Sequence, residues 1–92
     1  MALINKELAL RIARKLKAKI EKRPGRPHDL ACVYEGGKLV AQFGIRRGSN
    51  RELGHDFIPE NLFIGPHDAR DLGLCPRSRE WWINELERKG LL

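Results

Sequence analysis

Apolar residues recur every fourth position near the start of the chain, at Leu8, Ile12, Leu16 and Ile20. This spacing places them on one face of a helix, and Asn5 just before them is a residue type that caps helix N-termini. Pro24-Gly25 cannot continue a helix. The pattern therefore predicts an amphipathic helix over about residues 5–22, with its apolar face in the core.

A change of period follows after residue 29. Residues 30–34 have the composition of a strand, Gly36-Gly37 is a strong signal for a tight hairpin, and residues 39–46 alternate between apolar and more polar positions. Leu39, Ala41, Phe43 and Ile45 share one side of that second strand. We expect an antiparallel hairpin with this side in the core and the other half polar.

Apolar character returns at Phe57-Ile58 and Leu62-Phe63-Ile64. Pro59 lies between these two runs, so any third strand there should be an edge strand or broken at that point. Gly65-Pro66 favours the start of a short helix over about 66–73. A longer helix is predicted from Ser78 to Lys89, with Gly90 as its stop and Trp82 in the core.

These elements predict an α+β fold in a single domain, residues 1–92. It would contain an N-terminal helix, a small antiparallel sheet of two or three strands, and one short and one longer C-terminal helix. The length suits one modest core, and 41% hydrophobic with 33% charged residues is ordinary for a soluble protein. We expect no membrane span, no secretion signal and a cytoplasmic location. Cys32 and Cys75 have no metal-like spacing, and Cys32, in an apolar strand, is expected to be buried and reduced.

Charge is unevenly distributed along the chain. Residues 1–28 hold nine Lys/Arg against two Glu, a net charge of +7, whereas residues 29–92 hold nine against ten acids, a net −1. A basic arm on a nearly neutral body favours an anionic partner, either nucleic acid or an acidic protein. A solvated helix face that only keeps the protein soluble fits the same pattern.

Arginines gather at the end of the second hairpin strand and could neutralise phosphates there. Backbone N–H groups at Gly48-Ser49 could add an anion-binding nest. An ordinary loop whose arginines pair with Glu52, Asp56 or Glu60 is the alternative. The candidate nucleic-acid contacts are Arg46, Arg47, Ser49 and Arg51 at the strand end, and Arg11, Arg14, Lys15 and Lys22 from the first helix.

His55 stands beside Asp56 in the same region. A histidine that titrates near neutrality suits proton transfer in RNA cleavage, where the 2′-OH loses a proton and the 5′-oxygen gains one. This makes His55 the candidate catalytic residue of a metal-independent reaction. The alternative is a histidine that caps a turn or bonds a backbone carbonyl. His28, His55 and His67 match no zinc spacing, so we expect neither a metal nor another cofactor.

Several of these features together resemble the HicA-type toxin family. They are the leading helix, the hairpin, Gly48-Ser49 after an arginine-bearing strand, a histidine before Ile58-Pro59, and the closing Lys89-Gly90-Leu91-Leu92. The resemblance implies a double-stranded-RNA-binding-domain-like fold, cleavage of mRNA, and an antitoxin, here an acidic protein, as partner. The family has its catalytic histidine directly after Gly-Ser, whereas Asn50 follows Ser49 here.

Three hypotheses follow for the function. The first is a HicA-like RNA-binding domain that would act as a ribonuclease with His55, Arg46 and Arg47. The second is a nucleic-acid-binding module without catalysis. The third is a protein-interaction domain whose basic helix docks on an acidic partner.

Overall fold

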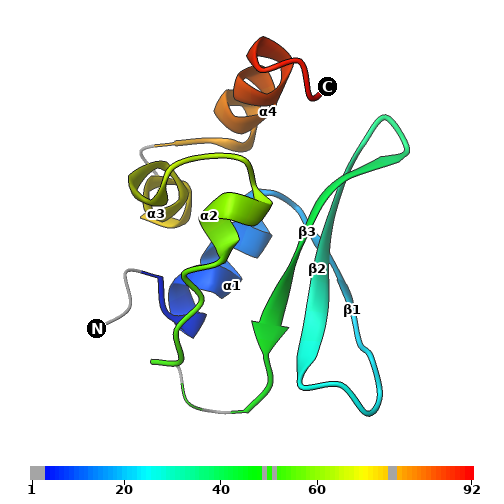
Figure 1. Cartoon of the computed structure of the whole chain (residues 1–92), viewed down its shortest axis with the longest axis vertical. Coiled ribbons are helices and arrows are strands. Elements are labelled where there is room, and N and C mark those ends of the chain that lie inside the picture. Colours follow the sequence, from blue (N-terminus) through cyan, green and yellow to red (C-terminus); the bar gives the residue numbers. More distant parts are fainter. Residues whose placement is uncertain (1–3, 49, 51, 75–76) are drawn as a thin grey trace.

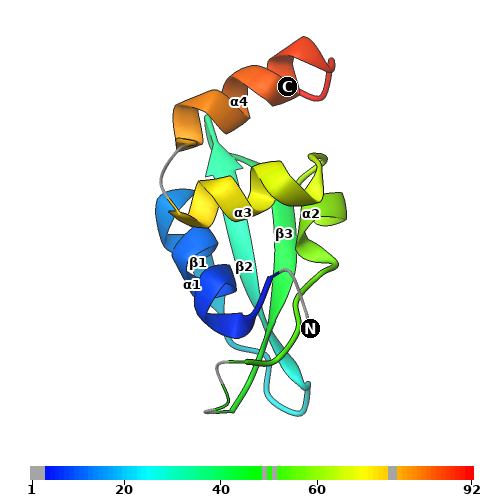
Figure 2. The same cartoon turned by 90° about the vertical axis from the view of Figure 1, so that its left-hand side faces the viewer.

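Three antiparallel strands form a sheet, and the helices gather on one of its faces (Figure 1; Figure 2). The computed structural model describes residues 4–48, 50, 52–74 and 77–92. The elements in chain order are α1 (Lys6–Lys15), β1 (Lys19–Glu21), β2 (His28–Glu35), β3 (Lys38–Arg46), α2 (Ile58–Asn61), α3 (Pro66–Leu74) and α4 (Arg79–Arg88). The predicted α+β arrangement is confirmed, with three strands rather than two.

The β2–β3 hairpin forms as predicted, except that Leu39, which is predicted to lie on the core face, is 49% exposed next to a register shift between Val33 and Tyr34. Gly36 and Gly37 join the strands with φ angles of 59° and 81°, and two positive φ angles are what the tightest hairpin turn requires. Alternation along the strands then sends Val33 and Phe43 toward the helices, where both are buried. No helix of the described residues lies on the other face of the sheet (Figure 1).

The first helix is shorter than predicted, because it ends at Lys15. Lys17 adopts a left-handed conformation with φ 56°. The Ala18 N–H bonds to the Ala13 carbonyl and the Lys17 N–H to the Arg14 carbonyl, which is the Schellman pattern of a helix end. The chain leaves the helix there, and Lys19–Glu21 pairs with β2 as strand β1. The prediction of a helix to residue 22 is therefore wrong.

Residues 57–64 do not form a third strand. The segment folds into α2, with Pro59 in its first turn, where a missing N–H costs nothing. Phe63, after this helix, has a left-handed backbone with φ 61°. The third strand of the sheet is β1 instead, on the far side of β2 from β3.

The C-terminal helices agree with the prediction. Ser78 caps α4 by accepting a hydrogen bond from the Trp81 N–H. Gly90, just after the end of this helix, has a positive φ. Trp82 is fully buried and its Nε1 donates to the Leu62 carbonyl at 3.0 Å. Across the described part of the chain, no helix is long and apolar enough to cross a membrane.

Cys32 lies in β2 as a buried, free thiol, as predicted. Burial raises the pKa of this thiol, and nearby Glu21 adds to the effect. A protonated, buried thiol is a poor nucleophile. Cys75 lies outside the described residues.

Candidate nucleic-acid interface

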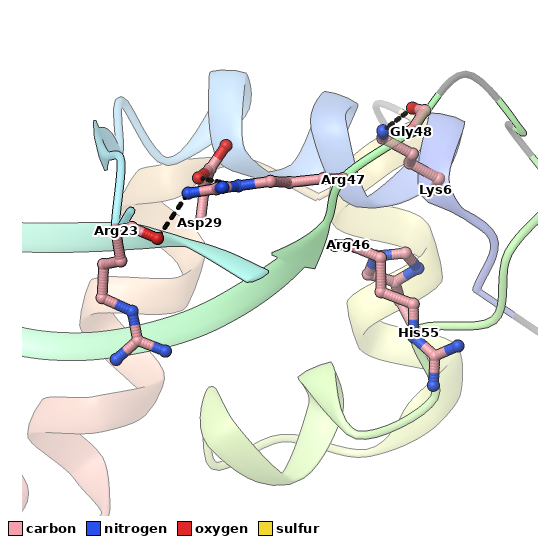
Figure 3. Close-up of polar contacts among 7 residues, drawn as sticks. All are labelled: Lys6, Arg23, Asp29, Arg46, Arg47, Gly48 and His55. Carbon is pink, nitrogen blue, oxygen red and sulfur yellow. Dashed lines mark hydrogen bonds and ion pairs between the residues drawn. The ribbon is translucent and has the colours of Figure 1, made fainter. Parts of the chain in front are cut away.

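The side chains of Arg46 and Arg47 point to opposite sides of the sheet. Arg46 and Arg47 follow one another at the end of β3, and strand alternation separates their side chains (Figure 3). Arg47 lies on the side of α1, where its Nε donates to Asp29 at 2.8 Å and its Nη2 donates to the Arg23 carbonyl at 2.6 Å. These two bonds hold the guanidinium in one orientation. Asp29 is thus the ion-pair partner, rather than Glu52, Asp56 or Glu60.

A groove of about 610 Å³ opens between α1 and this end of the sheet. Its floor is apolar, with Leu10 from α1, Ile20 from β1 and Ile45 from β3. Cationic residues surround that floor, and Asp29 is the one acidic residue in the lining. The lining cations are Lys6, Lys22, Arg46 and Arg47.

Lys6 connects the two walls of this groove. Its Nζ donates to the carbonyl of Gly48 across the opening (Figure 3). Gly48 has φ 109°, a backbone conformation that glycine adopts without strain. The position of Lys6 at the start of α1 therefore brings a helix cation to the strand end that bears Arg47.

The open face of the sheet has a second hollow, of about 430 Å³. Arg46 takes part in it, together with side chains from β2, from the β1–β2 link and from the residue before α2. The other lining residues are Arg23, His28, Leu30, Gly44 and Phe57. The rings of His28 and Phe57 meet edge to face, with centroids 6.3 Å apart.

The structure does not bring all predicted contacts to one place. Lys22, Arg46 and Arg47 line the groove. Arg14 and Lys15 line a different hollow of α1, next to Gly73 of α3. Arg11 also lies there, and it pairs with Glu7 one helical turn away. Ser49 and Arg51 lie outside the described residues.

His55 is fully buried and both of its ring nitrogens are engaged. Nε2 accepts a hydrogen bond from the Arg46 N–H at 3.0 Å, which assigns the proton to Nδ1, and Nδ1 donates to the Leu53 carbonyl at 2.9 Å. The neighbouring Asp56 accepts from the Ile4 N–H at 2.8 Å. These hydrogen bonds connect His55 and Asp56 to Leu53, to the end of β3 and to Ile4. They leave no ring nitrogen of His55 free to contact a substrate. This geometry favours the structural alternative over the catalytic one.

Burial lowers the pKa of His55, and the positive charges of Arg46, His28 and Lys6 lower it further, against the opposing effect of the Leu53 carbonyl. The folded protein therefore binds a proton at this site less readily than the unfolded chain does. Acidification below about pH 6.5 should thus favour unfolding.

We expect the free energy of unfolding to fall as the pH is lowered from about 7.5 to about 5, with the loss beginning near the ordinary histidine pKa. Urea unfolding at several pH values measures this. His55→Gln keeps a neutral acceptor for the Arg46 N–H but does not titrate, so its pH dependence should be shallower. Equal pH dependence in both proteins would mean that other groups cause it.

Three residues of this region were not among the nucleic-acid contacts predicted from the sequence. Lys6 and Arg23 stood among many helix and link cations, and His28 was considered only as a metal ligand. The available signal for His28 was alternation, because His28 and Leu30 share a face of β2 and His28 pairs with Arg46. In the described part of the chain, no three His, Cys, Asp or Glu residues group as metal ligands would.

The resemblance to HicA-type toxins rests on short motifs, and it stays a prediction. The chain matches no protein-family model, no curated protein and no solved structure.

Proposed function

We propose that this protein binds nucleic acid, with RNA as the favoured partner, across the end of the sheet where α1 meets β3. The observation that carries the proposal is the groove in which cations from α1, from the link after β1 and from the end of β3 surround an apolar floor. A surface that only keeps a protein soluble has no need to converge its charges on one concavity. Phosphate contacts from lysine and arginine are the main source of affinity for nucleic acids.

The groove residues have different parts in this proposal. Lys22 contributes a side-chain charge that neutralises phosphate, and Lys6 holds its ammonium group at the Gly48 carbonyl on the edge of the groove. Arg47 offers a guanidinium already oriented by Asp29. Because that ion pair is partly exposed, Arg47 can still interact with an anion on its outer side. The apolar floor of Leu10, Ile20 and Ile45 can pack against sugars or bases.

Replacing Lys6 and Lys22 together by alanine is expected to weaken RNA binding about tenfold at physiological salt. If each contacts one phosphate of a single strand, the plot of log affinity against log salt should become shallower by about 1.4. Fluorescence anisotropy of labelled RNA over a salt series measures both effects. The matched control is Arg14→Ala with Lys15→Ala, which removes the same charge from α1 outside the groove.

An equal loss in both double variants would show that net charge, not the groove, governs binding. No binding to RNA or DNA at low salt would overturn the proposal. In that case the basic helix would be better explained by an acidic protein partner, as an antitoxin would be.

A second candidate, cleavage of the bound RNA without a metal, is favoured by the position of His28. This histidine lies in the open hollow with Arg23 and Arg46, in contrast to the enclosed His55. An imidazole there could take the proton of a 2′-OH, so that the 2′-oxygen attacks the phosphate, the bond from phosphorus to the 5′-oxygen breaks and water gives that oxygen a proton. The arginines would stabilise the added negative charge on the phosphate. The products would be a 2′,3′-cyclic phosphate and a 5′-hydroxyl end.

Incubation of labelled RNA in EDTA with the wild-type protein, His28→Ala and His67→Ala tests this candidate. We expect cleavage by the wild-type protein and by the His67 variant, with a loss of at least about a hundredfold in the His28 variant. Binding without cleavage by the wild-type protein would leave a binding module.

A further inference from the structure

The hollow on the open face of the sheet differs in chemistry from the groove beside α1. Strand alternation brings His28 and Leu30 of β2 next to Gly44 and Arg46 of β3, on the face that the helices leave free (Figure 1). Phe57, just before α2, completes the hollow. Aromatic, aliphatic and cationic groups therefore meet in one concavity.

The two arginines of the hollow have no acidic partner among the residues that the structure describes. The Nε of Arg23 is buried, and nothing in that part of the chain accepts a hydrogen bond from it. Figure 3 shows the side chains of Arg23 and Arg46 extending away from α1, whereas Arg47 and Lys6 lie on its side. Arg47 is neutralised by Asp29; Arg23 and Arg46 keep their full charge for a ligand.

Gly44 lets His28 pack closely against β3. A Cβ atom at this position would lie 3.3 Å from the Cβ and ring atoms of His28, closer than side chains normally pack. The glycine therefore allows the His28 ring to lie against the strand at the side of the hollow. The volume of about 430 Å³ falls in the range of small-ligand sites.

We propose that this hollow holds one unpaired nucleotide of a single strand, with its base against Phe57, its phosphate at Arg46 and a neighbouring phosphate at Arg23. The inference rests on the proposed nucleic-acid binding and adds a preference to it. A base inside a duplex is stacked and paired, so only a single-stranded base can enter a hollow and stack on an aromatic ring. The protein should therefore bind single-stranded RNA more tightly than a duplex of equal length.

The test compares a short labelled uridine-rich strand with its duplex, both at one salt concentration. Phe57→Leu keeps an apolar side chain of similar bulk but removes the aromatic face. We expect it to weaken single-strand binding about tenfold and to leave duplex binding unchanged. Arg23→Gln, on the exposed link, should reduce single-strand binding more than duplex binding, and it tests the site even if the Phe57 variant does not fold.

Three results would distinguish this inference from the proposed function. If both variants bind strand and duplex as the wild-type protein does, while the Lys6/Lys22 variant binds weakly, the hollow is not a nucleotide site but the groove still binds. An equal loss on strand and duplex would also overturn the inference. If the wild-type protein binds neither RNA, the proposed function itself fails.

Discussion

Replacing His55 by alanine is expected to lower the free energy of unfolding by about 3 kcal/mol. The variant leaves a cavity and strands two buried backbone groups, the Arg46 N–H and the Leu53 carbonyl, without their partners. A domain of this size has a stability of only about 5–15 kcal/mol, so the loss is a large share. Urea unfolding at pH 7.5 followed by tryptophan fluorescence measures it.

His67→Ala is the control, because His67 is exposed at the start of α3, and its effect should stay within about 0.5 kcal/mol. The same pair of variants separates the two roles considered for His55. A structural histidine gives an unstable variant, whereas a catalytic one gives a variant that folds as well as the wild-type protein and loses only activity. The second result would contradict the role inferred from the hydrogen bonds.

Local signals were sufficient for much of the fold. The Gly36-Gly37 turn, the alternation of β3 from Ala41 to Ile45 and the cap at Asn5 depend on neighbouring residues only, and the structure confirms each of them. The pattern around Trp82 likewise gave the correct buried face of α4.

The end of α1 could not be predicted from the same signals. Helices that end with a left-handed residue usually have glycine or asparagine at that position. Here Lys17 adopts the left-handed conformation instead. Ile20 continues the four-residue spacing of the helix, yet it lies on β1 and is 45% exposed beside the groove. The pairing of β1 with β2 is a tertiary effect, and it outweighs the local periodicity.

The site shows the same division between local and distant information. Alternation predicts that Arg46 and Arg47 point to opposite sides of the sheet, and the structure places Arg46 at the border of both the groove and the hollow. The burial of His55 depends instead on Ile4, whose carbonyl accepts the His55 N–H and whose own N–H donates to Asp56. A local sequence pattern cannot show which segment, distant in sequence, will cover a histidine in the folded protein.

Replacing Trp82 by alanine should have the largest effect on stability, a loss of about 4 kcal/mol. The ring is fully buried between α4 and the rest of the core, and its Nε1 donates to the Leu62 carbonyl. Trp81→Ala is the matched control on the same helix. Trp81 is only partly buried, with the Arg77 guanidinium 4.6 Å from its ring centroid, so its loss should cost about 1 kcal/mol. Equal losses in the two variants would contradict this assignment of the core.

The Trp82 and His55 variants lose stability of similar size at opposite ends of the molecule, and this makes them a test of where RNA binds. Trp82 anchors α4, which contributes no residue to the groove or to the hollow. His55 holds the backbone of Arg46, which lines both. At low temperature, where both variants are mostly folded, Trp82→Ala should keep the RNA affinity of the wild-type protein. His55→Ala should weaken it about fivefold or more, since the strand end that presents two arginines loses its support. A larger loss of RNA affinity in Trp82→Ala than in His55→Ala would instead place the binding surface near α4.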